Sequence, residues 1–289
     1  MHFLEVTDLS HNYSVADKNS KPAINNISFS LEKGEILGII GHTGSGKSTL
    51  VSHLNGLLKP DSGKILLDGV DIWEKPKEIS KIRTRVGLVF QYPEYQLFEE
   101  TVYADIAFGP KNMGLDSVEI DKRIRRSAEL LGFGEELFEK SPFDLSGGQK
   151  RRVAIAGVVA MEPELIVFDE PTAGLDPVGR QAIFKAIKDY RSNRKASVII
   201  VSHSMEDMAA VCDKILVLNK GMVYDFGTTK EVFSKVKQLK SIGLNVPMIA
   251  EVFLNLKAEY GIESEGIITV DEAEQYLLSL LKERRKHRD

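Results

Sequence analysis

Three segments of this sequence carry residue types whose spacing indicates phosphate chemistry. The first, residues 41–49, reads GHTGSGKST and matches the pattern G-x-x-x-x-G-K-S/T between an expected strand and an expected helix. Its glycines let backbone amides curl around an anion, toward which the helix directs its positive end. Lys47 would neutralise phosphate charge, and the Ser48 hydroxyl would ligate Mg²⁺. The predicted nucleotide-binding residues are Gly41, His42, Thr43, Gly44, Ser45, Gly46, Lys47, Ser48 and Thr49.

The second segment is an apolar run, LIVF from residue 165, that ends in the two carboxylates Asp169 and Glu170. Ligands bind at the carboxyl ends of strands in open α/β sheets. We therefore expect Asp169 to hold Mg²⁺ and Glu170 to polarise the attacking water as a general base. Glu170 should point to the opposite face of the strand unless the strand has already ended. Two acids at a strand end are often only solvated, and the phosphate loop is what strengthens the prediction.

The third segment is LSGGQ, formed by Leu145, Ser146, Gly147, Gly148 and Gln149. A serine and two glycines that open a helix form a second cup for an anion. The alternative is a helix capped by Ser146, which also explains the five residues in isolation. A chain with one phosphate loop has little obvious use for two such cups on one nucleotide.

The elements that must position these segments alternate between strands and helices, which predicts an α/β sheet. In the first strand we expect Phe3, Glu5, Thr7 and Leu9 on one face and Leu4, Val6 and Asp8 on the other. Further strands are expected at 27–29, 35–40, 63–68, 86–90, 165–168, 197–201 and 214–218, with helices at 47–57, 150–160 and 178–190.

Two other regions differ in character from these alternating elements. Residues 92–160 are mostly helical, and Ile120, Ile124, Ala128 and Leu131 recur at helical spacing on one face. After the expected cassette of residues 1–230, residues 231–289 form a small accessory domain with helices and a turn of strand at 266–270. Its basic end, KERRKHRD, is interpreted as a solvated helix end rather than a lipid or RNA contact.

Composition excludes several classes of protein. The 289 residues are 43% hydrophobic and 28% charged, which argues against a disordered or coiled-coil chain. A net charge of -4 gives no general attraction to nucleic acid. A single cysteine, Cys212, permits no intrachain disulfide and leaves any metal to oxygen ligands. The longest apolar stretch, 153–161, is far shorter than the ~20 residues of a membrane span. With no secretory signal evident, we expect a cytoplasmic location.

The set GHTGSGKST, LSGGQ, IVFDEPTAGLD and VSH resembles the ATP-binding subunits of ATP-binding cassette (ABC) proteins over roughly residues 1–230. The resemblance implies a RecA-like α/β core with antiparallel β and helical subdomains, and two cassettes that sandwich ATP between the phosphate loop of one and LSGGQ of the other. By position, Gln91 resembles the glutamine that senses Mg²⁺ and water, and His203 the switch histidine. Residues 173–176 resemble the loop that crosses the dimer, and Tyr13 the aromatic residue on adenine, unless it only packs.

Residues 90–98, FQYPEYQLF, are similar to ATPases of energy-coupling factor (ECF) transporters, which take up vitamins and transition-metal ions. The continuation looks more like the second of the two paralogous ATPases. This implies a paralogous second cassette, a substrate-specific membrane subunit, and a transmembrane coupling subunit that docks near Gln91 to Glu100. Such a complex would place the chain peripherally on the cytoplasmic face of the membrane. Glu94, Glu99 or Glu100 would suit a coupling arginine, and the accessory domain would pair the two chains.

Three alternatives remain at this stage. A conventional importer that works with a solute-binding protein would carry the same cassette motifs. A soluble mechanical ATPase acting on DNA or ribosomes usually has a long coiled coil or two fused cassettes, neither of which this chain shows. A nucleotide-binding scaffold without turnover would lack the base or the switch residue, whereas Glu170 and His203 are both present. The transported substrate would be chosen by other subunits.

Overall fold

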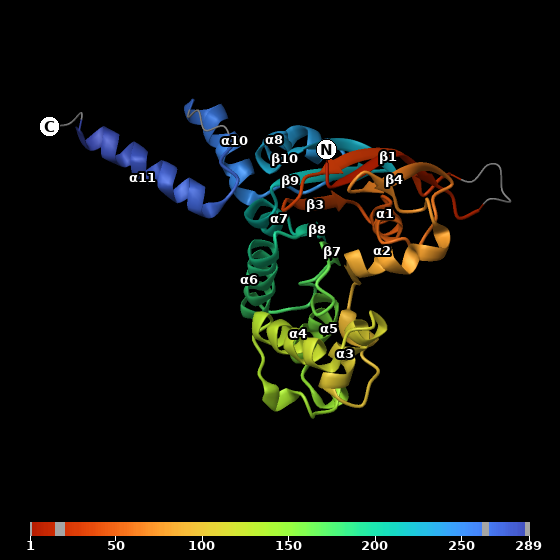
Figure 1. Cartoon of the computed structure of the whole chain (residues 1–289). Coiled ribbons are helices and arrows are strands. Elements are labelled where there is room, and N and C mark those ends of the chain that lie inside the picture. The colour runs from red at the N-terminus through yellow and green to blue at the C-terminus, as the bar shows by residue number, and fades with distance from the viewer. Residues whose placement is uncertain (1, 15–20, 262–265, 287–289) are drawn as a thin grey trace.

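The computed structural model describes residues 2–14, 21–261 and 266–286, with side chains in the last helix up to residue 282. Two β-sheets lie together at one end of the molecule, and a group of helices forms the other end (Figure 1). Long helices extend sideways from the sheets at the C-terminal end of the chain. The predicted α/β architecture is confirmed.

The larger sheet contains the strands that carry the phosphate chemistry. Five neighbouring strands are parallel, and the sixth, β10, pairs antiparallel at one edge. The central strand β3 is buried along its whole length, as expected for a strand covered on both faces. Neither β10 nor its edge position was predicted from the sequence. The order is β10 (Met222–Thr228), β9 (Lys214–Asn219), β3 (Ile36–Gly41), β8 (Ser197–Val201), β7 (Leu165–Asp169) and β6 (Val86–Val89).

The smaller sheet is antiparallel, and it corrects the predicted alternation of the first strand. Leu4 and Val6 are buried in one core cluster as expected, but Leu9 joins them, while Asp8 is exposed. The cause is a β-bulge between Val6 and Leu9, where Asp8 adopts a φ of 48° and shifts the side-chain alternation. The strand order is β2 (Ile24–Leu31), β1 (Leu4–His11), β4 (Ser62–Leu67) and β5 (Val70–Asp71).

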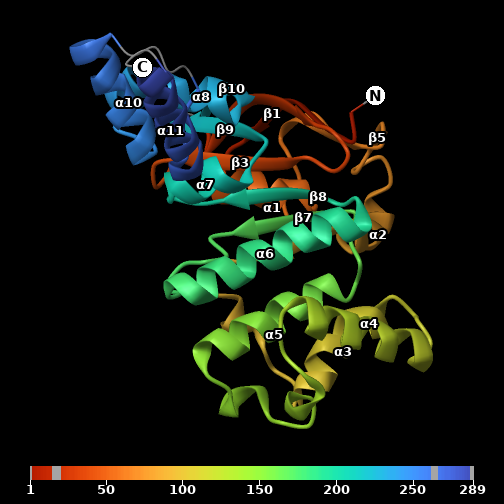
Figure 2. The ribbon, with the colours of Figure 1, turned by 90° about the vertical axis from the view of Figure 1, so that its left-hand side faces the viewer.

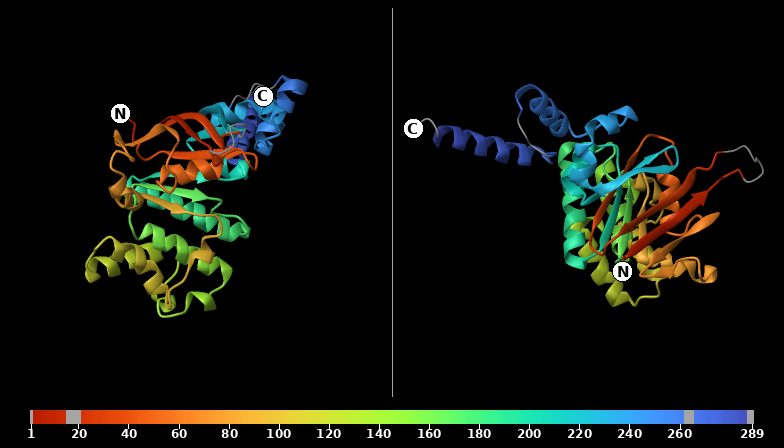
Figure 3. Two further views of the ribbon diagram at one scale, coloured as in Figure 1. Left: turned by 90° about the vertical axis from the view of Figure 1, so that its right-hand side faces the viewer. Right: turned by 90° about the horizontal axis from the view of Figure 1, so that it is seen from above.

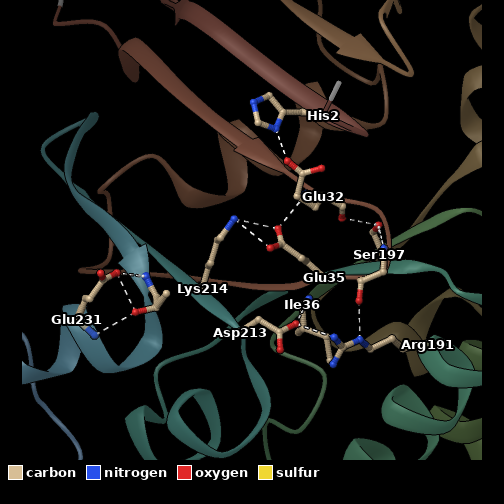
Figure 4. A network of polar contacts seen from close by, with 11 residues as sticks. His2, Glu32, Glu35, Ile36, Arg191, Ser197, Asp213, Lys214 and Glu231 are labelled. Carbon is tan, nitrogen blue, oxygen red and sulfur yellow. Dashed lines mark hydrogen bonds and ion pairs between the residues drawn. The ribbon is translucent and has the colours of Figure 1, made fainter. Parts of the chain in front are cut away.

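A polar network ties together the starts of three strands of the larger sheet (Figure 4). Asp213, before β9, accepts a hydrogen bond from the Ile36 amide at 2.8 Å and pairs with Arg191 at 2.9 Å. Glu35 pairs with Lys214 at 2.9 Å, and the Ser197 hydroxyl accepts from the Gly34 amide. These contacts align β3, β8 and β9 at their amino ends, so their carboxyl ends meet at the opposite edge.

Helices cover both faces of the larger sheet. The two faces contribute to two separate hydrophobic clusters, one of which is shared with the smaller sheet. Figure 2 shows α6 running along the sheet, between it and the helical end of the molecule. These helices are α1 (Lys47–Leu54), α2 (Ile79–Arg85) with the short η1 (Pro76–Glu78), α6 (Pro177–Arg194) and α7 (Met205–Val211).

The helical end of the molecule lies within residues 92–160. The predicted apolar face of α4 is confirmed, because Ile120, Ile124, Ala128 and Leu131 are all buried. Asp116 caps that helix by accepting from two backbone amides. The elements are η2 (Pro93–Gln96), α3 (Val102–Asn112), α4 (Ser117–Leu130), η3 (Glu135–Leu137), η4 (Pro142–Asp144) and α5 (Gly147–Val159).

The C-terminal region is helical, and the strand expected at 266–270 is wrong. The Glu272 carboxylate accepts from the amides of Ile268 and Thr269, so these residues form the start of a helix instead. Viewed from above, α11 extends away from both sheets (Figure 3). Residues 287–289 of the basic end lie outside the described residues. The helices are α8 (Thr229–Ser234), α9 (Val236–Ser241), α10 (Met248–Tyr260) and α11 (Val270–Lys286).

Within residues 2–14, 21–261 and 266–286, no helix combines the length and the apolar character that a bilayer crossing requires.

Candidate functional site

The phosphate loop joins the end of β3 to the start of α1, as predicted. Gly44 and Gly46 adopt φ angles of 77° and 101°, which favour glycine. A side chain at Gly41 would come within 2.4 Å of the Leu218 carbonyl oxygen, so this position also requires glycine. A side chain at Gly44 would meet nothing within 4 Å, because the loop faces open space there. Backbone amides can therefore approach an anion closely at this place.

Lys47 is buried at the first position of α1, with its ammonium group inside the loop. Its Nζ donates to the carbonyl oxygens of Gly41 at 2.6 Å and His42 at 2.9 Å. Burial lowers the pKa of Lys47, while the nearby carboxylates of Glu170 and Asp169 act in the opposite direction. The two carbonyl oxygens carry only partial negative charge. A phosphate group in the loop would supply the full negative charge that balances the Lys47 ammonium group.

Asp169 is the last residue of β7, and Glu170 lies just beyond the strand. Glu170 has a φ of 52°, and its amide donates to the Val201 carbonyl at 2.9 Å. The strand has therefore ended, and the expectation of opposite pleat faces does not apply. Burial raises the pKa of Asp169 above its usual value. Burial, reinforced by repulsion from Asp169, raises the pKa of Glu170 to about 7.

A cavity of about 470 Å³ brings these groups together at the carboxyl edge of the larger sheet. Gln91, which follows β6, and His203, which follows β8, reach it from the strands on either side of β7. Ala23 also lines the cavity, although nothing in the sequence patterns pointed to it. The lining residues are Ala23, Thr43, Gly44, Gly46, Lys47, Ser48, Thr49, Gln91, Asp169, Glu170 and His203.

His203 faces Glu170 across this cavity. The distance from its Nε2 to Glu170 Oε1 is 3.5 Å, and that buried oxygen has no hydrogen-bond partner within the described chain. Burial and the charge of Lys47 lower the pKa of His203, which favours its neutral ring. An unpartnered carboxylate oxygen beside an imidazole can accept a proton from a water molecule held between them.

Among Tyr13 and the nine loop residues 41–49 predicted to bind nucleotide, four lie outside the cavity lining: Tyr13, Gly41, His42 and Ser45. Tyr13 is 63% exposed, its hydroxyl lies 3.3 Å from Thr49 Oγ1, and its ring meets His11 edge-on. An exposed aromatic ring beside the loop is suited to stack on a base. The ring of His42 instead makes a 2.7 Å hydrogen bond with the carbonyl of Ile242 in the C-terminal region. No pattern in the sequence indicated that contact.

The LSGGQ segment opens α5 and is exposed from Ser146 to Gly148. The Ser146 hydroxyl accepts from the Gln149 amide, and the Gln149 side chain accepts from the Ser146 amide, so the helix cap considered as the alternative does form. None of residues 145–149, all of them described, lines the 470 Å³ cavity. The segment predicted to form a second anion cup is thus exposed on the outside of the chain.

The surface at residues 91–100 is rich in exposed aromatic rings. Tyr95 and Phe98 are 84% and 58% exposed, and Phe98 meets Phe108 edge-on at 5.0 Å. Glu94 differs from the expected free acid, because both its oxygens accept from Arg151, at 2.7 and 2.9 Å. An internal guanidinium therefore already pairs with Glu94, whereas Glu99 and Glu100 are the other two carboxylates expected to suit a coupling arginine.

Arg151 was missed in the sequence, although it follows LSGGQ by only two residues. Besides binding Glu94, it donates to the carbonyl oxygens of Pro171 and Ala173. It therefore links the aromatic surface at 91–100 to the segment that follows Glu170. The only signal in the sequence was a cation close to a glycine-rich motif. That signal did not indicate that Arg151 contacts Glu94 and the segment after Glu170.

Comparisons with known proteins agree with this geometry. The family model described as ABC transporter matches residues 24–173. The chain therefore belongs to the ABC transporter family, as one of its ATP-binding and ATP-hydrolysing members.

Within this family, the similarity to ECF transporter ATP-binding proteins extends over nearly the whole chain. The chain is 49% identical to the protein EcfA2 of Caldanaerobacter subterraneus subsp. tengcongensis over 96% of this chain and 98% of that one. It is 50% identical to EcfA2 of Clostridium tetani, over 96% of each.

Solved structures confirm the predicted cassette fold. The structure of cbiO1 from Clostridium perfringens, part of the ABC transporter complex cbiONQ, has a TM-score of 0.74 and 39% identity, over 88% of this chain and 99% of that one. A dimeric ATP-binding cassette in a post-hydrolysis state, bound to ADP and phosphate, has a TM-score of 0.70 and 27% identity, over 78% of this chain and 98% of that one.

Proposed function

We propose that this chain is the ATP-hydrolysing subunit of an ECF transporter, bound peripherally to the cytoplasmic face of the membrane, where it powers uptake of vitamins or other micronutrients. The observation that carries the proposal is the cavity that joins Lys47 to Asp169, Glu170 and His203. Near-full-length likeness to ECF ATP-binding proteins supports the transporter type. A conventional importer is less favoured because the relatives named above are of the ECF kind.

Mg²⁺ fits the oxygen-rich side of the cavity. Ser48, Gln91 and Asp169 all line it and would hold the ion. The burial that raises the pKa of Asp169 would be offset by a bound cation, so the carboxylate suits this task. The ion would supply charge neutralisation at the phosphates. Lys47 and the loop amides would bind the same phosphates and orient them.

Glu170 would be the general base. Its Oε1 lacks a hydrogen-bond partner among the described residues and faces the cavity, so a water molecule placed there could give it a proton. His203 Nε2, 3.5 Å away, would orient that water and contact the terminal phosphate. Gln91 would sense both the ion and the water from the other wall. The tyrosine at position 13 would stack on the base of ATP.

A second cassette would complete the site. Residues 145–149 are remote from the cavity lining and would serve the nucleotide of the partner, while residues 173–176 would cross the dimer interface. We propose a paralogous partner, and hence a heterodimer. The accessory domain at 231–289 would add to the pairing, since Leu277, Leu278 and Leu281 of α11 are exposed. ATP would close the pair, and hydrolysis would reopen it.

The membrane partners would meet the surface between Gln91 and Glu100. Exposed Tyr95 and Phe98 offer an apolar platform for a cytoplasmic helix of the coupling subunit. Glu100 is exposed and Glu99 half-buried, so these two, rather than Glu94, would accept a coupling arginine. Because Arg151 joins Glu94 to the Ala173 carbonyl, movement at this surface would reach the nucleotide site directly. The substrate-specific membrane subunit would bind the coupling subunit.

Affinity purification of the tagged full chain from membranes tests this proposal. We expect three companions to be retained: a second cassette, a coupling subunit and a small substrate-binding membrane subunit. The double variant Tyr95→Ser and Phe98→Ser should lose the membrane subunits while keeping ATP binding. Val70→Ser, which removes an apolar side chain that is 54% exposed on β5, away from the proposed docking and pairing surfaces, is the control. Retention of a soluble solute-binding protein with two permeases would contradict the ECF assignment.

A further inference from the structure

A second, larger cavity lies away from the nucleotide site. It measures about 850 Å³ and opens between α4 and α5 of the helical end and α6, which runs along the larger sheet. None of its described lining residues also lines the 470 Å³ cavity. Its volume falls within the usual range of about 300–1,000 Å³ for small-molecule sites.

The lining of this cavity carries an excess of positive charge. Its described lining has five cations against the three carboxylates Glu129, Glu162 and Asp189. The five cations come from three helices, α4, α5 and α6. The cations are Arg123, Arg126, Arg152, Lys185 and Arg194.

Glu162 shows how unequal the charges are. This one carboxylate pairs with Arg123 at 3.4 Å and Arg126 at 3.7 Å, and it also contacts Arg194 closely. Three guanidinium groups therefore contact this acid, although Arg123 also pairs with Glu119 at 2.8 Å. Burial, together with the neighbouring charges of Arg123 and Arg126, lowers the pKa of Arg194, as expected where cations crowd. The contact from Arg126 is long, and its side chain is 55% exposed, so it is available to a ligand.

Two further cations face the cavity without a strong partner. The Nε of Arg152 is buried and has no hydrogen-bond partner in the described part of the chain. Lys185 is exposed on α6. A buried unpartnered donor of a guanidinium group is costly unless something else satisfies it. Arg126, Arg152 and Lys185 together form the cationic face, and a multivalent anion would satisfy all three.

One part of the cavity wall is apolar, which narrows the chemistry of the ligand. Leu131, Val159 and Ala186 are buried side chains that line the same cavity. An inorganic ion would contact only the cationic face, and the apolar wall would remain in contact with water. We propose that the cavity between α4 and α6 binds a phosphate-bearing small organic molecule, with its phosphate on Arg126, Arg152 and Lys185 and its apolar part on this wall. The ligand would bridge the helical end and α6.

Binding of phenyl phosphate and inorganic phosphate to the full chain, with the nucleotide site filled by a saturating non-hydrolysable ATP analogue, tests this inference by titration calorimetry. Phenyl phosphate should bind more tightly than inorganic phosphate. The double variant Arg126→Gln and Lys185→Gln should weaken phenyl phosphate binding by at least about tenfold, with the affinity for the ATP analogue unchanged. Because binding of the ATP analogue and the ECF assignment play no part in this readout, the two proposals can fail separately.

Lys122→Gln is the matched control, since it removes an exposed cation from α4 that does not line the cavity. It should bind phenyl phosphate as the wild type does. If Lys122→Gln lost as much affinity for phenyl phosphate as the double variant, the loss would come from general charge attraction, and the proposed site would be wrong. Equal affinity for the two phosphates, or unchanged binding by the double variant, would overturn it as well. Arg152→Gln, checked for folding by its thermal transition, should show a loss similar to that of the double variant.

Discussion

Glu170 should make the protein less stable in the absence of nucleotide, because its carboxyl is buried beside Asp169. Only the charged form suffers from burial and from this repulsion. Replacing it with glutamine, which has the same shape and no charge, should therefore stabilise the nucleotide-free protein. A residue that opposes folding in the resting state but is needed for turnover is a familiar feature of active sites.

The size of this gain in the free energy of unfolding follows from the pKa of Glu170, which is about 7 in the folded protein against the ordinary value of 4.5. The folded state binds the proton more tightly than the unfolded state, so stability falls as pH rises through the window from about 4.5 to about 7. At 1.36 kcal/mol for each tenfold change, the full shift corresponds to at most about 3 kcal/mol at pH 8. Because the carboxyl is partly solvated and water screens its charge, Glu170→Gln should raise the free energy of unfolding by about 0.5 kcal/mol at pH 5 and about 1–2 kcal/mol at pH 8.

Urea unfolding followed by circular dichroism, with EDTA and without nucleotide, measures this difference at both pH values. Glu139→Gln, at an exposed position in the helical end, is the control and should change stability by less than about 0.5 kcal/mol at either pH. The reasoning is refuted if Glu170→Gln is no more stable than the wild type at pH 8. An advantage that does not grow between pH 5 and pH 8 would refute it too.

Three further substitutions have expected outcomes. Lys47→Ala should weaken ATP binding by at least about tenfold in titration calorimetry, because it removes the cation inside the loop; unchanged affinity would exclude the loop as the phosphate site. Glu94→Gln should destabilise the chain by about 3 kcal/mol in urea, since it leaves the buried Arg151 uncompensated, and a neutral effect would contradict that pairing. His42→Ala should remove about 1 kcal/mol through its bond to Ile242 and hasten proteolysis within residues 231–261; unaltered cleavage would contradict the coupling.

Much of the nucleotide site could be predicted because most of its residues lie in short, contiguous sequence motifs. The loop glycines, Lys47 and the acids after β7 each lie at a strand end, and a parallel sheet brings strand ends to one edge. Gln91 and His203 needed the family resemblance, since a lone glutamine or histidine after a strand has many uses. Their place in the cavity agrees with the resemblance.

The remaining features depend on contacts that no local pattern contains. The bulge at Asp8 reverses the side-chain alternation of β1, and periodicity alone cannot locate a bulge. The short run at 266–270 resembled a strand, yet a carboxylate two residues later turned it into a helix start. The pairing of Glu94 with Arg151 joins residues 57 positions apart, so the sequence offered only an acidic loop.

The measurement that tests the central claim most directly is the nucleotide bound to the purified transporter complex after one turnover with Mg²⁺ and ATP. When the wild-type complex has converted its bound ATP to ADP, a complex with Glu170→Gln in this chain should still hold unhydrolysed ATP in this chain's site. The expected slowing of hydrolysis there is about 10²- to 10⁴-fold. If the Glu170→Gln complex converted its bound ATP to ADP as fast as the wild-type complex, this cavity could not be the ATPase site that uses Glu170 as its base.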